Sequence, residues 1–180
     1  NYDRVIETAY SSSSTAIQTV VPFLSNNDRV DEKIRNPSSV ALIKLHGCVT
    51  RTHDEKLPLI LTLDQYATYK NERTRLFQML EEFGSENTII FVGHKLNDPN
   101  LRGILLDLSK NISSRPRYYL VRPDISPVER DFWGQKRISV LDGTFEDLLN
   151  ALDKEIDKNK RPLLAKIDVD HPIRLRFVTH

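Results

Sequence analysis

The sequence predicts a three-layer α/β domain with a mostly parallel sheet. Segments in which apolar residues recur at helical spacing alternate with short apolar runs that have the length of strands. The clearest of these runs are 39–45, 88–92, 117–121 and 137–141. The first two are followed by glycine-containing loops, at Gly47 and Gly93. Strands that alternate with helices in this way are typical of βαβ units, whose helices cover both faces of a parallel sheet.

The first part of the chain predicts a helix and two strands. Residues 2–10 have weak helical character, and after a polar break the β-prone run at 15–24 predicts a strand. Residues 26–39 are rich in charge and contain a proline, which predicts a loop. The apolar run at 39–45 then predicts a buried strand.

An amphipathic helix of about five turns is expected next. Thr62 is followed three residues later by Gln65, the capping-box arrangement that marks a helix start. We expect Gly84 to end the helix. The apolar residues that recur at helical spacing between these points are Tyr66, Tyr69, Leu76, Phe77, Leu80 and Phe83.

The second half of the chain predicts three strands and two more helices. After the most apolar strand, at 88–92, Asp98 is expected to cap a helix that has Pro99 at its first position. The predicted core face of this helix consists of Leu101, Ile104, Leu105 and Leu108. Strands are then expected at 117–121 and 137–141.

The last predicted helix begins at a second capping box, formed by Thr144 and Asp147. The residues that it is expected to bury are Phe145, Leu148, Leu149, Leu152 and Ile156. We assign residues 1–157 to one domain and 158–180 to a C-terminal extension, whose alternating pattern predicts a strand that leads to another element. Because the sequence begins without an initiator methionine and Met79 is its single methionine, the chain is expected to be part of a longer polypeptide.

The charges of the chain nearly balance, with 26 Lys and Arg against 25 Asp and Glu and a net charge of +1. This balance gives no argument for a dedicated nucleic-acid or membrane surface. No apolar run approaches the roughly 20 residues that span a bilayer, and no signal segment is recognisable. Cys48 is the single cysteine, which argues against an internal disulfide and a four-cysteine zinc site. We therefore expect a cytoplasmic protein without a bound metal.

Three short motifs carry the functional signature. Residues 1–3 are Asn-Tyr-Asp, residues 45–47 are Leu-His-Gly, and residues 93–98 are Gly-His-Lys-Leu-Asn-Asp. The last two follow predicted strands, and ligands of open α/β sheets bind beyond the carboxyl ends of strands. The order of the three motifs resembles the sirtuin-like NAD-consuming family, in particular the bacterial anti-phage branch that hydrolyses NAD and lacks the zinc module.

The resemblance implies a Rossmann-like fold, with NAD+ as the substrate and nicotinamide and ADP-ribose as the products. It also implies a glycine-rich segment upstream of residue 1, a homo-oligomer and a partner such as an ATPase or a phage-sensing protein or domain. A typical protein deacylase of the family carries a Cys-x-x-Cys zinc module after its His-Gly motif, and no such pair follows Gly47.

His46 is the first residue to which the resemblance assigns a role. In the family this histidine lies over the nicotinamide ribose, and an imidazole with an unperturbed pKa near 6.5 suits a proton acceptor at neutral pH. Gly47 would let the backbone approach the ligand closely because it has no Cβ. From the local pattern alone, a purely structural histidine is an equally good interpretation.

Asn1 and Asp3 complete the implied catalytic group. The resemblance implies that Asn1 contacts the ribose and orients water, and that Asp3 helps to hold the carboxamide. Cleavage of the bond to nicotinamide develops positive charge on the sugar, which a nearby carboxylate and amide stabilise. The alternative is that either residue caps the first helix, and the two interpretations are compatible.

The nucleotide contacts are expected mainly in the loop after the strand at 88–92. The resemblance assigns them to Gly93, His94, Lys95 and Leu96, with a lysine where the family usually has serine. Lys95 could neutralise a pyrophosphate as a point charge, or be a solvated loop residue. Asp98 is included, although a helix cap is its more ordinary role, and the helix N-terminus itself favours an anion. The implied wall of the adenosine site consists of Val121, Asp142, Gly143 and Thr144.

Three functions stay open at this stage. The first is an NAD+ hydrolase that acts as an antiviral, abortive-infection effector. The second is a non-catalytic module that senses NAD or ADP-ribose, which Lys95 favours and the presence of both Asn1 and His46 disfavours. The third is an NAD-dependent protein deacylase or ADP-ribosyltransferase.

Overall fold

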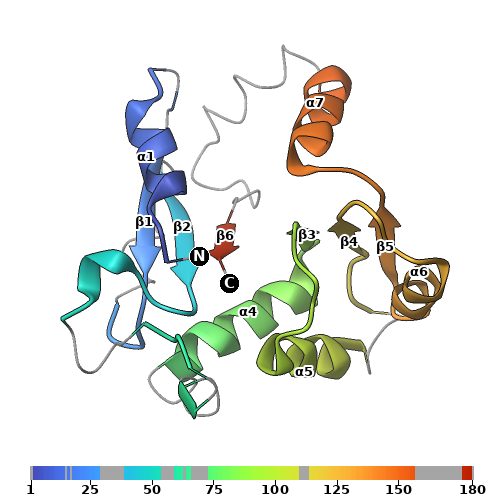
Figure 1. Ribbon diagram of the computed structural model, residues 1–180, viewed down its shortest axis with the longest axis horizontal. Helices are drawn as coiled ribbons and strands as arrows, with labels where there is room; N and C mark the ends of the chain where they lie inside the picture. The colour runs from blue at the N-terminus through green and yellow to red at the C-terminus, as the bar shows by residue number, and fades with distance from the viewer. Residues whose placement is uncertain are drawn as a thin grey trace. The chain divides into compact units, whose positions relative to one another are not determined.

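The computed structural model describes residues 2–14, 16, 18–28, 39–53, 59–62, 64–65, 73–109, 114–156 and 176–179. The chain divides into two compact units (Figure 1). Unit 1 consists of Asn1–Met79 together with Asn159–His180, and unit 2 consists of Leu80–Lys158. Each unit contains a three-stranded sheet in which every described strand pair is parallel, so the predicted α/β class with parallel sheets is confirmed.

Unit 1 is built around strand β2. Its described elements are α1 (Val5–Ser12), β1 (Thr19–Phe23), β2 (Ser39–Lys44), the 3-10 helix η1 (Val49–Arg51) and β6 (Arg176–Thr179). The sheet order is β1-β2-β6, which makes β2 the central strand, and all of its residues after Ser39 are buried. The predicted helix at 2–10 and the predicted strands at 15–24 and 39–45 are confirmed.

Unit 2 has strand order β3-β4-β5. Its described elements are β3 (Ile90–Val92), α5 (Pro99–Leu108), β4 (Tyr118–Val121), α6 (Pro127–Gly134), β5 (Ile138–Leu141) and α7 (Phe145–Glu155). Helix α4 (Thr74–Glu86) contributes residues to both units. The predicted core face of α5 is confirmed, because Leu101, Ile104, Leu105 and Leu108 are all buried.

The caps expected from the sequence form as predicted. The Gln65 backbone N–H donates to Thr62 Oγ1 at 3.2 Å, and the Thr62 N–H donates to Gln65 Oε1 at 3.0 Å. Thr144 and Asp147 make the same reciprocal pair at the start of α7. Tyr66 and Tyr69 lie outside the described residues. Helix α6 was not predicted, although Ser126 followed by a proline is a cap signal of the same kind as the one before α5.

Gly84 does not end α4, as the sequence had suggested, because the helix continues to Glu86. The glycine is required by packing. A Cβ at this position would lie 2.8 Å from Leu108 Cδ1 and 2.9 Å from Tyr118 Oη. Tyr118 Oη also donates a hydrogen bond to the Gly84 carbonyl. The position is therefore a close contact inside unit 2 rather than a helix stop.

The prediction that α7 buries its apolar face is also wrong. Phe145 is 57% exposed, Leu149 is 48% exposed, and Leu152 and Ile156 are exposed as well. Leu148 is half-buried. The spacing of these residues predicted correctly that they share one helix face, but spacing does not determine what packs against that face.

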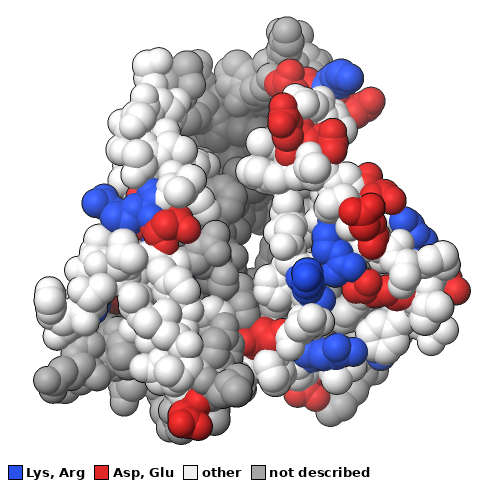
Figure 2. All heavy atoms as spheres, viewed as in Figure 1, with Lys and Arg blue, Asp and Glu red and all other residues white. Residues whose placement is uncertain are grey.

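The surface agrees with the near-balanced composition. On the face drawn in Figure 2, the acidic and basic side chains of the described residues are interspersed and do not form a field of one sign. Within the ranges that the structure describes, no helix is long and apolar enough to cross a membrane.

Two helical glycines provide a matched test of this packing. We predict that Gly84→Ala lowers the free energy of unfolding by about 1–3 kcal/mol, because its methyl group would overlap Leu108 and Tyr118. A Cβ at Gly103, in α5, would meet nothing within 4 Å. Gly103→Ala should therefore raise stability by about 0.5–1 kcal/mol through helix propensity. Urea unfolding measures both, and equal effects of the two substitutions would contradict the packing role of Gly84.

Candidate functional site

The first two sequence motifs lie next to each other in unit 1. The Val49 N–H donates to the Tyr2 carbonyl at 2.9 Å, and Tyr2 Oη donates to the Ile60 carbonyl. The Tyr2 ring centroid lies 6.4 Å from that of His46. Asn1 lies outside the described residues. The segment that follows it is thus fixed against the turn that carries His46, although the two are far apart in the sequence.

His46 lies in the turn just after β2, and its side chain is 4% exposed. Its carbonyl accepts a hydrogen bond from the Ile60 N–H at 3.1 Å. Gly47 follows with φ of 98°, a backbone conformation that strains residues with a Cβ. The glycine after the histidine is therefore needed for the turn itself, and its expected role in close ligand approach remains a prediction.

The Asp3 side chain makes a local contact at the start of α1. Asp3 Oδ1 accepts a hydrogen bond from the Val5 N–H at 3.0 Å, and the residue is exposed. The N-cap residue of α1 is Arg4, so Asp3 does not cap the helix as the alternative interpretation expected, and its side chain instead closes a local turn just before it. Its second carboxylate oxygen and its exposure are compatible with a ligand contact, which stays a prediction.

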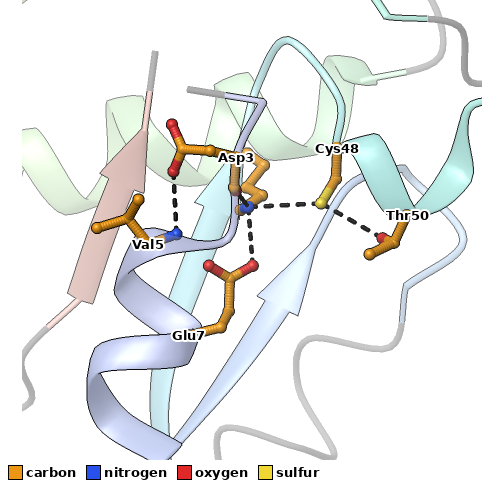
Figure 3. Close-up of polar contacts among 6 residues, drawn as sticks. Asp3, Val5, Glu7, Cys48 and Thr50 are labelled. Carbon is orange, nitrogen blue, oxygen red and sulfur yellow. Dashed lines mark hydrogen bonds and ion pairs between the residues drawn. The ribbon is translucent and has the colours of Figure 1, made fainter. Parts of the chain in front are cut away.

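Sequence reasoning missed a buried polar cluster beside this segment (Figure 3). Lys44, at the end of β2, lies with its Nζ 2.7 Å from Glu7 Oε1. The ammonium also donates to the Asp3 carbonyl and, at 3.4 Å, to Cys48 Sγ. The signal was available in the sequence, because Lys44 is the one charged residue in a run predicted to be a buried strand.

The Cys48 thiol is part of the same cluster. Burial by itself raises its pKa, but hydrogen bonds from Thr50 and the positive charge of Lys44 outweigh burial, so that the pKa lies below its ordinary value. Thr50 Oγ1 donates to Cys48 Sγ at 3.3 Å. The thiol thus acts as a hydrogen-bond acceptor inside unit 1. We predict that the thiol takes no part in catalysis.

The predicted nucleotide loop lies in unit 2 and is tightly folded. The Gly93 N–H donates to the Val121 carbonyl at 3.0 Å, and Gly93 has φ of 64°. The Leu96 N–H donates to His94 Nδ1 at 2.7 Å, and Leu96 is fully buried with φ of 54°. Because Nδ1 is an acceptor here, a neutral His94 carries its proton on Nε2. Lys95 is exposed between these two fixed residues.

Asp98 caps α5, as its position before a proline predicted. Its Oδ1 accepts hydrogen bonds from the Asn100 N–H at 2.9 Å and the Leu101 N–H at 2.8 Å. Asp98 is itself buried. Two of the N–H groups that could bind a phosphate at this helix end are therefore already occupied by a carboxylate of the same chain.

The ends of β3, β4 and β5 lie side by side in unit 2. Gly93 is joined to Val121 as described, and the Arg122 N–H donates to the Leu141 carbonyl at 3.2 Å. Asp142 and Thr144 are exposed just beyond β5. Gly93, Val121 and Asp142 thus lie at or just beyond the ends of neighbouring parallel strands, whereas Gly47, also expected to contact the ligand, belongs to unit 1.

Thr144 is engaged in its capping box. Its backbone N–H donates to Asp147 Oδ2 at 2.8 Å and its hydroxyl donates to the same oxygen at 2.7 Å. These two hydrogen bonds lower the pKa of Asp147. The local role of Thr144 is thus to start α7, and a contact with adenosine is a further prediction. No group of three or more potential metal-binding side chains occurs in the part of the chain that the structure describes.

Comparison with known proteins identifies the family. The family model of the SIR2-like domain matches residues 1–141. This range includes all three motifs and extends to the end of β5. The chain belongs to the SIR2-like family. The resemblance seen in the sequence is thereby confirmed, and the two parallel sheets with their helices are consistent with a SIR2-like, Rossmann-like fold.

One relative of this SIR2-like chain is Defense-associated sirtuin 2 of Bacillus subtilis. The two are 24% identical over 149 residues, a stretch that covers 79% of this chain. The same stretch covers 14% of the relative, so the SIR2-like chain spans a small part of that protein's length.

The capping role of Asp98 in this SIR2-like domain can be tested by mutation. We predict that Asp98→Ala lowers the free energy of unfolding by about 1 kcal/mol, because the N–H groups of Asn100 and Leu101 lose their acceptor. Asp98→Asn keeps one side-chain oxygen and should cost less. Chemical denaturation without any nucleotide measures both, and a silent Asp98→Ala would show that the cap contributes nothing.

Proposed function

We propose that this SIR2-like domain is an NAD+ hydrolase that cleaves the bond between nicotinamide and ribose. The observation that carries the proposal is the attachment of the Asn-x-Asp segment to the turn of His46 through Tyr2. The resemblance places the catalytic groups on these two segments, and a joint site requires them to be close together. The products would be nicotinamide and ADP-ribose.

The chemistry follows from the groups on the two segments. When the bond between nicotinamide and C1′ of the ribose breaks, its electron pair leaves with nicotinamide, which departs as a neutral molecule. The positive charge that develops on the sugar is stabilised by nearby carboxylate and amide groups, the proposed roles of Asp3 and Asn1. Water then adds to C1′, and His46 accepts the proton that the water loses. The net reaction consumes one water and releases one proton.

We further propose a role in defence against phage. The support is the similarity to Defense-associated sirtuin 2, whose name states an association with defence. Depletion of NAD+ in an infected cell would be the means, as in abortive infection. A cytoplasmic location, a homo-oligomer and a partner such as an ATPase or a phage-sensing protein or domain belong to the same proposal.

A sensing module is the second candidate. The observation that favours it is the exposed Lys95 in the loop where the family usually has serine. A module that only bound NAD or ADP-ribose would not need a proton acceptor. A protein deacylase or ADP-ribosyltransferase is less well supported, because the sequence has a single cysteine and therefore no Cys-x-x-Cys module.

Ligand binding is the first test. We predict that NAD+ or ADP-ribose raises the melting temperature of the protein, because a ligand that binds only the folded state adds about 2.7 kcal/mol of stability at 100 times its Kd. ATP at the same concentration should have a much smaller effect. Differential scanning fluorimetry measures the shift, and equal shifts with ATP would argue against a site for NAD+.

The chemistry is tested at the two catalytic positions. We predict that His46→Ala or Asn1→Ala lowers the rate of nicotinamide release on the order of a hundredfold or more, since positioned acid–base groups commonly supply 10²–10⁴-fold. His53→Ala is the matched control, because His53 is exposed and lies in the turn after η1. A folded His46→Ala protein that consumes NAD+ at the parent rate would exclude this mechanism and favour the sensing module.

A further inference from the structure

The ammonium of Lys44 is buried in an apolar strand. Its side chain is 2% exposed, and the residues between Ser39 and Lys44 in β2 are buried and uncharged. Removing a charged ammonium from water costs several kcal/mol unless it is paired and hydrogen-bonded. A leucine or valine would fill the end of a central strand without that cost. The lysine therefore needs an explanation beyond packing.

The three contacts of the ammonium come from three different segments. Glu7 belongs to α1, and its side chain is only 12% exposed. The Asp3 carbonyl belongs to the Asn-x-Asp motif. Cys48 belongs to the turn that follows His46 and Gly47. An ammonium has three N–H donors, so these acceptors can satisfy all of them. A planar guanidinium would not offer this compact arrangement.

The hydrogen bond to Asp3 connects Lys44 to the candidate catalytic segment, which an ion pair with Glu7 alone would not do. It joins the end of β2, two residues before His46, to the backbone of the motif that carries Asn1 and Asp3. Tyr2 provides two further ties, from its carbonyl to the Val49 N–H and from its hydroxyl to the Ile60 carbonyl. The contacts of Tyr2 fix the position of the segment, and the hydrogen bond from Lys44 to the Asp3 carbonyl fixes its orientation one residue later.

We propose that Lys44 is a positioning residue, which with Glu7 holds the Asn-x-Asp segment at a fixed distance from His46. The proposal rests on the proposed NAD+ hydrolysis, because it assigns Lys44 to that site. A displacement of about 1 Å in a catalytic group can reduce a rate a hundredfold. Loss of the tie should therefore reduce turnover although Lys44 itself does not contact the substrate.

The test uses Lys44→Met in the full chain, because methionine keeps an unbranched side chain and removes the charge and all three donors. We expect kcat for NAD+ hydrolysis to fall tenfold or more, while KM for NAD+ changes less than about threefold, since other residues are expected to hold the nucleotide. Amide hydrogen exchange over residues 2–12 should become faster than in the parent protein. Exchange over β4 and β5 in unit 2 should not change.

A double variant separates positioning from stability. In Lys44→Met the carboxylate of Glu7 is left buried without its cation, which lowers the melting temperature. Lys44→Met/Glu7→Gln removes that charge and should recover part of the melting temperature without recovering kcat. If kcat returns together with the melting temperature, Lys44 has only a structural role and the proposal is overturned.

Arg115→Met is the matched control. Arg115 is a buried cation of unit 2, 3% exposed, that donates to the carbonyls of Pro116 and Lys136. Its replacement should lower the melting temperature but leave kcat of the folded protein unchanged. If Arg115→Met loses kcat to a comparable extent, the effect of Lys44→Met is explained by lower stability, and the proposal is overturned.

The hydrogen-exchange measurement also tests the role of Lys44 independently of the proposed NAD+ hydrolysis. If the parent protein releases no nicotinamide, the hydrolase assignment fails, but exchange over residues 2–12 still reports on the tie. Faster exchange in both Lys44 variants and not in Arg115→Met would support positioning of the segment by Lys44. Unchanged exchange in the Lys44 variants would refute it.

Discussion

A single positive charge at the end of a buried strand sets the conditions for the rest of unit 1. Lys44 ends the central strand β2 with its side chain only 2% exposed, so its ammonium must find its partners within the chain. Glu7 can reach it only if α1 lies against the sheet, and the Asp3 carbonyl only if the chain before α1 runs past the end of β2. The need to neutralise one ammonium thus fixes the path of the first residues.

Local sequence signals accounted for most of the secondary structure. Helix caps depend on two or three neighbouring residues, so Asp98 and the Thr144 capping box could be recognised without a fold. The predictions that were wrong depended on packing partners that are distant in the sequence. Glycine often ends a helix, which predicts an end at Gly84, whereas contacts with Leu108 and Tyr118 require this glycine inside the helix.

The candidate site could be predicted to a similar extent. The motifs pointed to His46 and Asp3, and the structure of unit 1 shows how Tyr2 connects their segments. The pairing of Lys44 with Glu7 could not be foreseen, because nothing in a strand pattern indicates which carboxylate will meet a buried lysine. In unit 2, the loop at Gly93 is held by the hydrogen bond from the Gly93 N–H to the carbonyl of Val121, which lies on the next strand, β4.

The position of β6 has a consequence for synthesis on the ribosome. Ala41 of β2 pairs with Arg176, and the whole of unit 2 lies between them in the chain. Unit 2 is continuous, so it can fold as soon as its own residues have emerged, whereas unit 1 must wait for its last strand. Domains emerge at about 5–20 residues per second, so the sheet that carries His46 stays incomplete for several seconds after β2 has been made. Of the two described sheets, the one beside the candidate catalytic turn is thus completed last, although its strands β1 and β2 precede every strand of unit 2.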